Sequence, residues 1–129
     1  MLRLLLFAAL LVSGCSVAEP SDPDIEGARS PEAEGVVVNR TSTDFVTLAV
    51  DVDIAAVINI ASEITDLDSE AVVRRGEAAP LDVYEYRKGK DFIVYIFRVR
   101  GDRATLDASL LVKGDTFERD DRVVTVERF

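Results

Sequence analysis

The chain has 129 residues, of which 24 are acidic and 15 are basic, so its net charge is −9. This excess of negative charge repels phosphates and excludes nucleic-acid binding as a function class. Histidine is absent and cysteine occurs once, which removes Ser-His-Asp and Cys-His catalysis, the usual zinc sites and thiol redox chemistry. We therefore expect no catalytic residue, no metal centre and no cofactor.

The first fourteen residues have the pattern of a secretory signal peptide. Arg3 is their only charged residue, residues 4–12 are apolar, and the small residues Ser13 and Gly14 follow. A membrane-spanning helix needs about 20 apolar residues, and this run has less than half that length. The segment predicts a signal that is removed from the mature protein.

The residues Val12-Ser13-Gly14-Cys15 resemble the lipobox of bacterial prolipoproteins, which is cleaved before the cysteine. The resemblance covers the signal segment alone. It implies that the Cys15 thiol carries a diacylglycerol and its amine a fatty acyl chain such as palmitate, a combination that anchors stably. It also implies a lipid-anchored position on the extracytoplasmic side of the bacterial cell membrane, or of the outer membrane if the host has two, because Ser16 follows the cysteine. A plain signal peptide cut near Ala18 is the alternative.

Residues 15–35 have the composition of a disordered tether. They contain three prolines, two glycines, six acidic residues and few apolar side chains. Such a segment buries too little apolar surface to offset the entropy lost on ordering. We therefore divide the chain into a signal peptide (residues 1–14), an acidic tether (residues 15–35) and one domain (residues 36–129).

The domain shows short stretches rich in Val, Ile, Thr, Tyr and Phe, separated by turn residues, which is typical of strands. The predicted strands are residues 36–41, 44–53, 71–75, 79–86, 92–100, 104–113 and 122–129. Their spacing predicts an all-β fold, a small immunoglobulin-like sandwich of six to seven antiparallel strands, with a small β-barrel as the alternative.

Two helical segments interrupt the strand pattern. Residues 54–64 carry apolar side chains at helical spacing after Asp53, a candidate N-cap, and predict a short helix or an irregular crossover. Asp115 and Glu118 are spaced like a capping box and predict a helical turn before the last strand.

The acidic clusters are weak candidates for sites. They are the pairs Asp51 with Asp53, Asp66 with Asp68, and Asp120 with Asp121. Two carboxylates supply too few of the six to eight oxygens that calcium takes, so we interpret all three pairs as solvated. A spatially assembled carboxylate pair of a hydrolase stays open. The sequon-like residues Asn39-Arg40-Thr41 are interpreted as a turn.

Residues 84–90 form a basic and aromatic cluster. Tyr84, Tyr86, Arg87 and Lys88 are candidate ligand-binding residues, because aromatic faces beside cations stack sugars and dock anionic groups. The alternative is a solvated hairpin turn whose charges discourage edge pairing.

Residues 92–100 are apolar on both faces of the predicted strand. The longer row, which ends in Val99, is expected to face the core, and the row of Phe92, Val94 and Ile96 to face outward. Residues 54–67 would cover this outward row, or the row would form a partner-binding patch. The candidate residues of that patch are Phe92, Val94, Ile96, Arg98 and Arg100.

Two functions remain open. The first is a non-enzymatic interaction or scaffold module of the cell envelope, attached to the membrane through the lipid on Cys15 and binding an envelope protein. The second is a small-ligand or glycan-binding protein, or a carboxylate-based hydrolase, that works through a pocket near Tyr84 and Tyr86.

Overall fold

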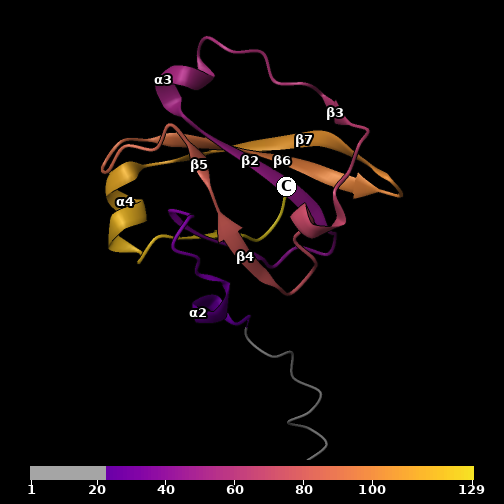
Figure 1. Cartoon of the computed structure of the whole chain (residues 1–129), viewed down its shortest axis with the longest axis horizontal. Coiled ribbons are helices and arrows are strands. Elements are labelled where there is room, and N and C mark those ends of the chain that lie inside the picture. The colour runs from indigo at the N-terminus through magenta and orange to yellow at the C-terminus, as the bar shows by residue number, and fades with distance from the viewer. Residues whose placement is uncertain (1–22) are drawn as a thin grey trace, which may run out of the picture.

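The computed structural model describes residues 23–129, and most of them lie in two β-sheets (Figure 1). The strands are β1 (Gly35–Asn39), β2 (Phe45–Asp51), β3 (Glu63–Ile64), β4 (Ala78–Leu81), β5 (Val83–Tyr84), β6 (Phe92–Arg100), β7 (Arg103–Val112) and β8 (Val123–Val126). The helices are α2 (Ile25–Ala28), α3 (Val52–Ala55), the 3₁₀ turn η1 (Ser69–Ala71) and α4 (Gly114–Arg119).

The two sheets confirm the predicted all-β sandwich. One has the strand order β4-β1-β8 and the other the order β3-β7-β6-β2-β5. The pairs β1–β8 and β2–β5 are parallel and the other pairs are antiparallel. The sheets are therefore mixed, whereas the sequence predicted antiparallel strands throughout.

The main core fills the space between the sheets. Val37 and Val124 contribute from the three-stranded sheet, and Phe45 and Val94 from the five-stranded sheet. Phe117 of α4 closes one end of this core, where the chain passes from β7 to β8 (Figure 1). The rings of Phe117 and Phe92 meet edge to face with centroids 4.9 Å apart, a favourable geometry for aromatic pairs.

The predicted orientation of β6 is wrong. Phe92, Val94 and Ile96 are at most 1% exposed and lie in the main core, so no outward patch of these residues exists. The sequence predicts the opposite face because Arg98, a charged residue, ends this row. Arg98 lies at the margin of the sandwich, where its guanidinium stacks over the Phe129 ring at 5.0 Å and pairs with Asp107 at 2.6 Å. A long side chain can reach solvent in this way from a core-facing position.

A second, smaller core covers the outer face of the five-stranded sheet. Phe97, Val46 and Ala104 are buried there, beneath the apolar side chains Ile60, Ile64, Leu67 and Val72. The segment between α3 and η1 thus folds over the sheet, as the sequence suggested. It covers the row of β6 that includes Phe97 and not the predicted row of Phe92, Val94 and Ile96. Because both rows are covered, both faces of β6 can be apolar.

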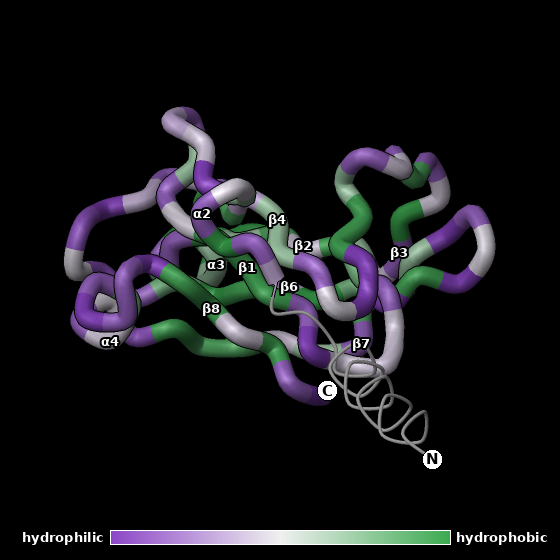
Figure 2. Tube along the Cα trace, turned by 90° about the horizontal axis from the view of Figure 1, so that it is seen from below, coloured by the Kyte–Doolittle hydropathy of each residue, from purple (hydrophilic) through white to green (hydrophobic). Residues whose placement is uncertain are grey.

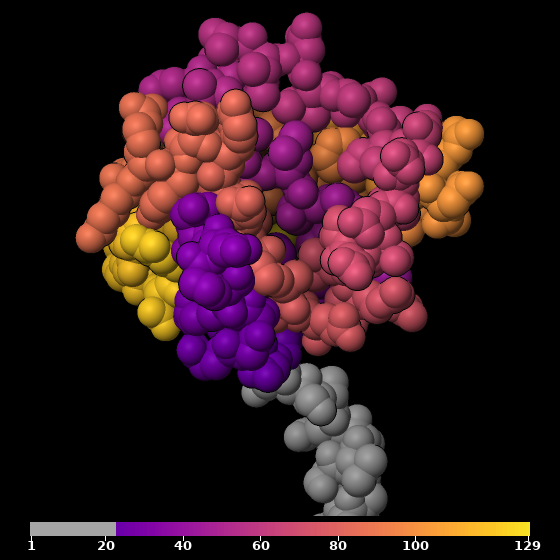
Figure 3. All heavy atoms as spheres, in the orientation of Figure 1, coloured from indigo at the N-terminus to yellow at the C-terminus, as the bar shows by residue number. Residues whose placement is uncertain are grey.

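Residues 24–34 are ordered and pack on the domain, so the predicted disordered tether does not extend to residue 35. Asp24 caps α2, and α2 contacts β1 and β4. Figure 2 shows α2 lying over these strands, and Figure 3 shows the indigo atoms of the first described residues beside the yellow atoms of α4. Glu34 accepts a hydrogen bond from the Val83 N–H at 2.7 Å. The apolar outer face of β1 gives this segment a surface to cover, since Val36 and Val38 are at most 1% exposed.

The helical predictions are partly confirmed. α3 is shorter than expected and is capped by Asp51 instead of Asp53. α4 forms at the predicted place, but Asp115 and Glu118 do not form the predicted capping box. The carboxylate of Asp91 instead accepts the N–H of Gly114, the first residue of α4, at 2.9 Å. Residues 71–75 contribute only the isolated bridge between Val73 and Phe45 to the sheets.

Candidate functional site

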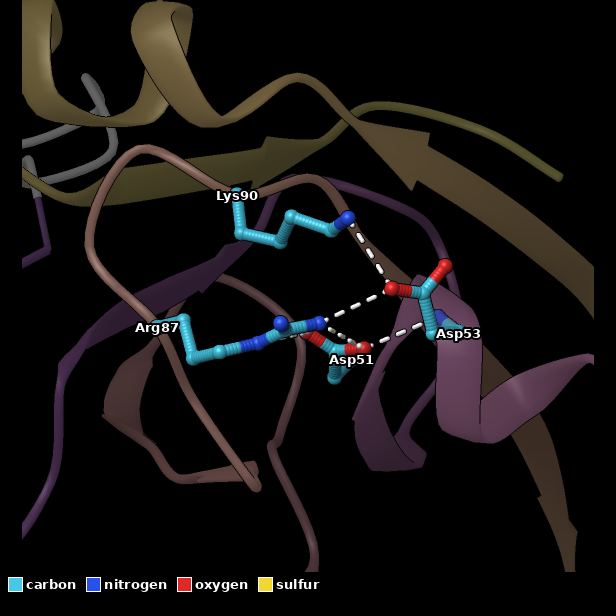
Figure 4. Close-up of polar contacts among 4 residues, drawn as sticks. All are labelled: Asp51, Asp53, Arg87 and Lys90. Carbon is cyan, nitrogen blue, oxygen red and sulfur yellow. Dashed lines mark hydrogen bonds and ion pairs between the residues drawn. The ribbon is translucent and has the colours of Figure 1, made fainter.

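Two cations of the cluster predicted from residues 84–90, Arg87 and Lys90, pair with carboxylates at the end of β2 and the start of α3 (Figure 4). Asp51, the last residue of β2, is 1% exposed and accepts the Asp53 N–H at 2.8 Å as the N-cap of α3. Arg87 donates to both Asp51 carboxylate oxygens, at 3.0 and 2.9 Å, and to Asp53 at 3.0 Å. Lys90 pairs with Asp53 at 2.9 Å. The four charges join the β5–β6 loop to the start of α3.

The two carboxylates of this cluster are held in their ionised forms. Burial raises the pKa of Asp51, but the hydrogen bonds from Arg87 and from the Asp53 N–H outweigh it, so its pKa is lowered overall. The pKa of Asp53 is lowered by Lys90 and then by Arg87. The prediction that Asp51 and Asp53 are solvated is therefore wrong for Asp51, which is buried and ion-paired.

A shallow depression of about 370 Å³ lies over this cluster, between residues of α3 and of the β5–β6 loop. The Arg87 guanidinium is already bound by the carboxylates of Asp51 and Asp53, so a ligand that bound Arg87 would have to displace Asp51. Such an arrangement is typical of an ion pair that holds a loop in place.

The two predicted tyrosines do not share a surface. Tyr84 pairs with Val50 on β2 and is 59% exposed. The Tyr86 ring turns toward the core, with its centroid 6.1 Å from that of Phe117, and its hydroxyl donates a short hydrogen bond to Glu118. Burial, followed by that hydrogen bond, raises the pKa of Tyr86 to about 12. Lys88 is exposed, so the predicted ligand-binding residues do not converge.

The other acidic pairs have local structural roles. Asp68 caps η1 by accepting the Glu70 N–H at 3.0 Å, and Asp121 pairs with Arg29 at 3.3 Å. Within residues 23–129, no three carboxylate, histidine or cysteine side chains come together as a metal would require.

The open side of the sandwich is a feature that the sequence did not reveal. The edges of β7 and β8 face each other across a groove of about 300 Å³. Leu110 and Val112 of β7, Val123 and Val124 of β8, and Phe117 of α4 provide its apolar lining. Lys113 and Asp120 are its ionisable residues. Concave, mostly apolar sites of this size are typical of binding sites.

One sequence signal could have indicated this groove. Strands at sheet edges are usually protected by proline, by inward charges or by a covering segment. Residues 108–112 carry no charge and no proline. The strand pattern alone, however, does not show which strand has a free edge, because this depends on the topology of the sheet.

The predicted signal peptide and Cys15 lie outside the described residues. None of the helices formed by residues 23–129 is long and apolar enough to cross a membrane.

Comparison with known proteins identifies no relative: no family model, no curated protein and no solved structure matches the chain.

Proposed function

We propose that this protein is a non-enzymatic interaction module of the bacterial cell envelope, anchored to the membrane by a lipid on Cys15. The observation that carries the binding role is the open side of the sandwich, where two unpaired strand edges flank an apolar groove. The lipobox-like residues before Cys15 support the anchored position. The domain would then present its groove to an envelope protein while the lipid retains it at the membrane.

Two observations favour this role over a glycan site or a hydrolase. The carboxylates of the Asp51 cluster are bound by Arg87 and Lys90, and Tyr84 and Tyr86 lie on different sides of their segment. A general base must reach the proton that it removes, and a carboxylate held by a guanidinium is poorly placed for this.

The anchor is tested by Cys15→Ala in cells that produce the protein. We expect the variant to leave the membrane fraction and to lose its fatty acyl label, because one cysteine provides the whole attachment. A variant that remains acylated, or that fractionates with the membrane as before, would contradict the anchored role.

The binding site is tested with a photoreactive phenylalanine analogue at Leu111 of β7 or at Tyr84 of β5. Position 84 is the matched control for position 111, because both side chains are 59% exposed on strands of the same sheet. We expect one discrete cross-linked product from position 111 and none from position 84. Equal labelling at both positions, or no product from either, would contradict the groove as the binding site.

A further inference from the structure

We propose that the groove binds an extended, basic segment of a partner protein, which adds as a strand to the edge of β7. This inference rests on the proposed function and names the chemistry of the partner.

The first argument is the unpaired backbone of β7. β6 pairs with β7 along its length, but β3 pairs only with Thr105 and Ala104. The Leu106 N–H donates to the Ser62 carbonyl at 2.8 Å. From residue 107 to residue 112, no segment of residues 23–129 pairs with the outer edge. This stretch has the length of a typical strand, and its free N–H and C=O groups are a template for another strand.

The second argument is the incomplete burial of the side chains on this edge. Leu110 and Val112 pack against the main core but are only half-buried. Their pairing partners on β6, Val94 and Phe92, are at most 1% exposed. Leu111, on the other face, is 59% exposed. An added strand would cover both faces, since alternate side chains of a strand point to opposite sides of the sheet.

The third argument is that β8 supplies the opposite wall. Among the described strands β8 pairs with β1 alone, so its other edge also faces the groove. Val123 is half-buried and Thr125 is exposed there, while Phe117 and Val124 are buried in the floor. Apolar side chains on one face of an added strand would therefore enter a preformed groove.

The charge of the groove selects the partner. Lys113 is paired with Asp91 at 3.0 Å, whereas Asp120 has no cationic side chain in contact among the described residues. Among the residues that line the groove, the unbalanced charge is thus negative, as is the net charge of −9 on the chain. Lys or Arg side chains in the partner would complement it. The same net charge disfavours a second copy of this chain as the occupant.

The probe is an end-capped eight-residue peptide that alternates valine with lysine, titrated against the full chain in non-ionic detergent. We expect saturable binding by fluorescence anisotropy, with at least tenfold weaker binding of the peptide that alternates valine with glutamate. Amide hydrogen exchange of residues 107–112 should slow at least tenfold when the lysine peptide is bound. Absence of binding, or equal binding of the two peptides, would overturn the basic-segment assignment.

Strand addition is tested with two N-methylated forms of the lysine peptide, one methylated at every lysine nitrogen and the other at every valine nitrogen. The amide hydrogens of alternate residues point to opposite edges of a strand. We therefore expect one form to lose at least tenfold in affinity and the other to bind within about threefold of the parent. Two forms that both bind like the parent would show a contact without strand pairing.

The site is tested with Thr125→Arg, which places a cation in the groove, and with Thr105→Arg as the matched control on the stretch of β7 that β3 covers. We expect at least tenfold weaker peptide binding for T125R and less than a twofold change for T105R. Equal effects would overturn the placement of the peptide in the groove.

Sedimentation of the peptide-free chain as a dimer that T125R dissociates would identify a second copy as the occupant and overturn the proposal. Cross-linking from Leu111 without peptide binding would leave the proposed function intact and exclude this partner class alone.

Discussion

Asn39 is a fully buried polar side chain that ties three segments together. Its Nδ2 donates to the carbonyls of Thr43 and Val73, both at 2.9 Å, and its Oδ1 accepts from the Thr41 N–H at 2.9 Å. The amide group of Asn39 therefore joins the end of β1, the following loop and the Val73 bridge. The burial of Asn39 also makes it inaccessible to modification in the folded protein.

Replacing Asn39 with Ala should lower the free energy of unfolding by about 3 kcal/mol, because the substitution removes the hydrogen bonds that its side chain makes with the Thr43 and Val73 carbonyls and with the Thr41 N–H in a buried site. Urea unfolding measures this loss. Asn59→Ala is the matched control, since Asn59 is exposed, and it should change stability by less than about 0.5 kcal/mol. Similar losses for the two variants would mean that the hydrogen bonds of Asn39 contribute little.

Asp51 combines a helix cap with a buried ion pair. Asp51→Ala should lower the free energy of unfolding by about 2 kcal/mol, because it removes the cap of α3 and leaves Arg87 without its buried partner. Asp53→Asn should cost much less, since the Asp53 side chain is 62% exposed. Thermal unfolding of both variants tests the difference, and a larger loss for Asp53→Asn would reverse this assignment.

The same carboxylate gives a pH dependence with a defined sign. The pKa of Asp51 in the folded protein is lowered from its ordinary 3.8, so the unfolded state binds protons first as the pH falls. The stability that Asp51 contributes is complete above 3.8 and is lost as the pH drops through the lowered pKa. Thermal midpoints measured from about pH 5 to about pH 2 should therefore fall less in Asp51→Asn than in the unmodified chain. Parallel curves would contradict the shift.

At the scale of elements, the hairpin of β6 and β7 was the most predictable part of the chain. Its strand patterns are long, and Gly101, with φ of 64°, occupies the turn conformation that glycine favours. The orientation of β6 was not predictable, because both of its faces are apolar. Deciding between them requires the position of the segment that covers the outer face, which is long-range information.

The orientation of β6 is tested by placing aspartate on each face of the hairpin. Val94→Asp should cost about 4 kcal/mol or more, because Val94 is fully buried and the new charge would lack a partner. Leu111→Asp, at an exposed position of the neighbouring strand, should cost less than about 1 kcal/mol. Circular dichroism during urea unfolding measures both, and a folded Val94→Asp protein with normal stability would contradict the assigned core.

The N-terminal segment shows why composition misplaced the domain boundary. Its prolines, glycines and acids predict disorder, yet α2 lies on a strand whose outer face is apolar. A chain that begins at Ala33 should therefore melt about 5 °C or more below one that begins at Pro23, because Val36 and Val38 lose their cover. Equal midpoints in a thermal scan would restore the predicted boundary at residue 35.

At the scale of the whole molecule, the sequence could predict the class of fold and the anchor hypothesis, but it could not locate the candidate site. Of the candidate residues near Tyr84, Arg87 is bound to Asp51 and Tyr86 packs against the core, whereas Tyr84 and Lys88 are exposed. The groove depends on β8 lying at the edge of one sheet and on β3 covering only part of the outer edge of β7 in the other. That arrangement is fixed by the pairing of β8 with β1 and by the return of the chain through α4, which local patterns do not encode.

The fold and the proposed anchor together predict how the domain is oriented at a membrane. Pro23 follows Cys15 by eight residues, a separation of at most about 28 Å. Residues 24–34 then run along the outer face of the three-stranded sheet, whereas α3 and the segment after it lie on the opposite side of the molecule (Figure 1). The α2 side should therefore face the bilayer, and the covered face of the five-stranded sheet should point away from it.

This orientation is measured with a fluorophore on Glu26→Cys or Asn59→Cys in vesicles that carry spin-labelled headgroups. Both positions are exposed, and in the lipidated protein the acylated Cys15 thiol does not take the label. We expect the fluorophore at position 26 to be quenched more strongly than that at position 59, because the short connection to the anchor holds α2 near the headgroups. Equal quenching would mean that the domain tumbles freely, and stronger quenching at position 59 would place the opposite face against the membrane.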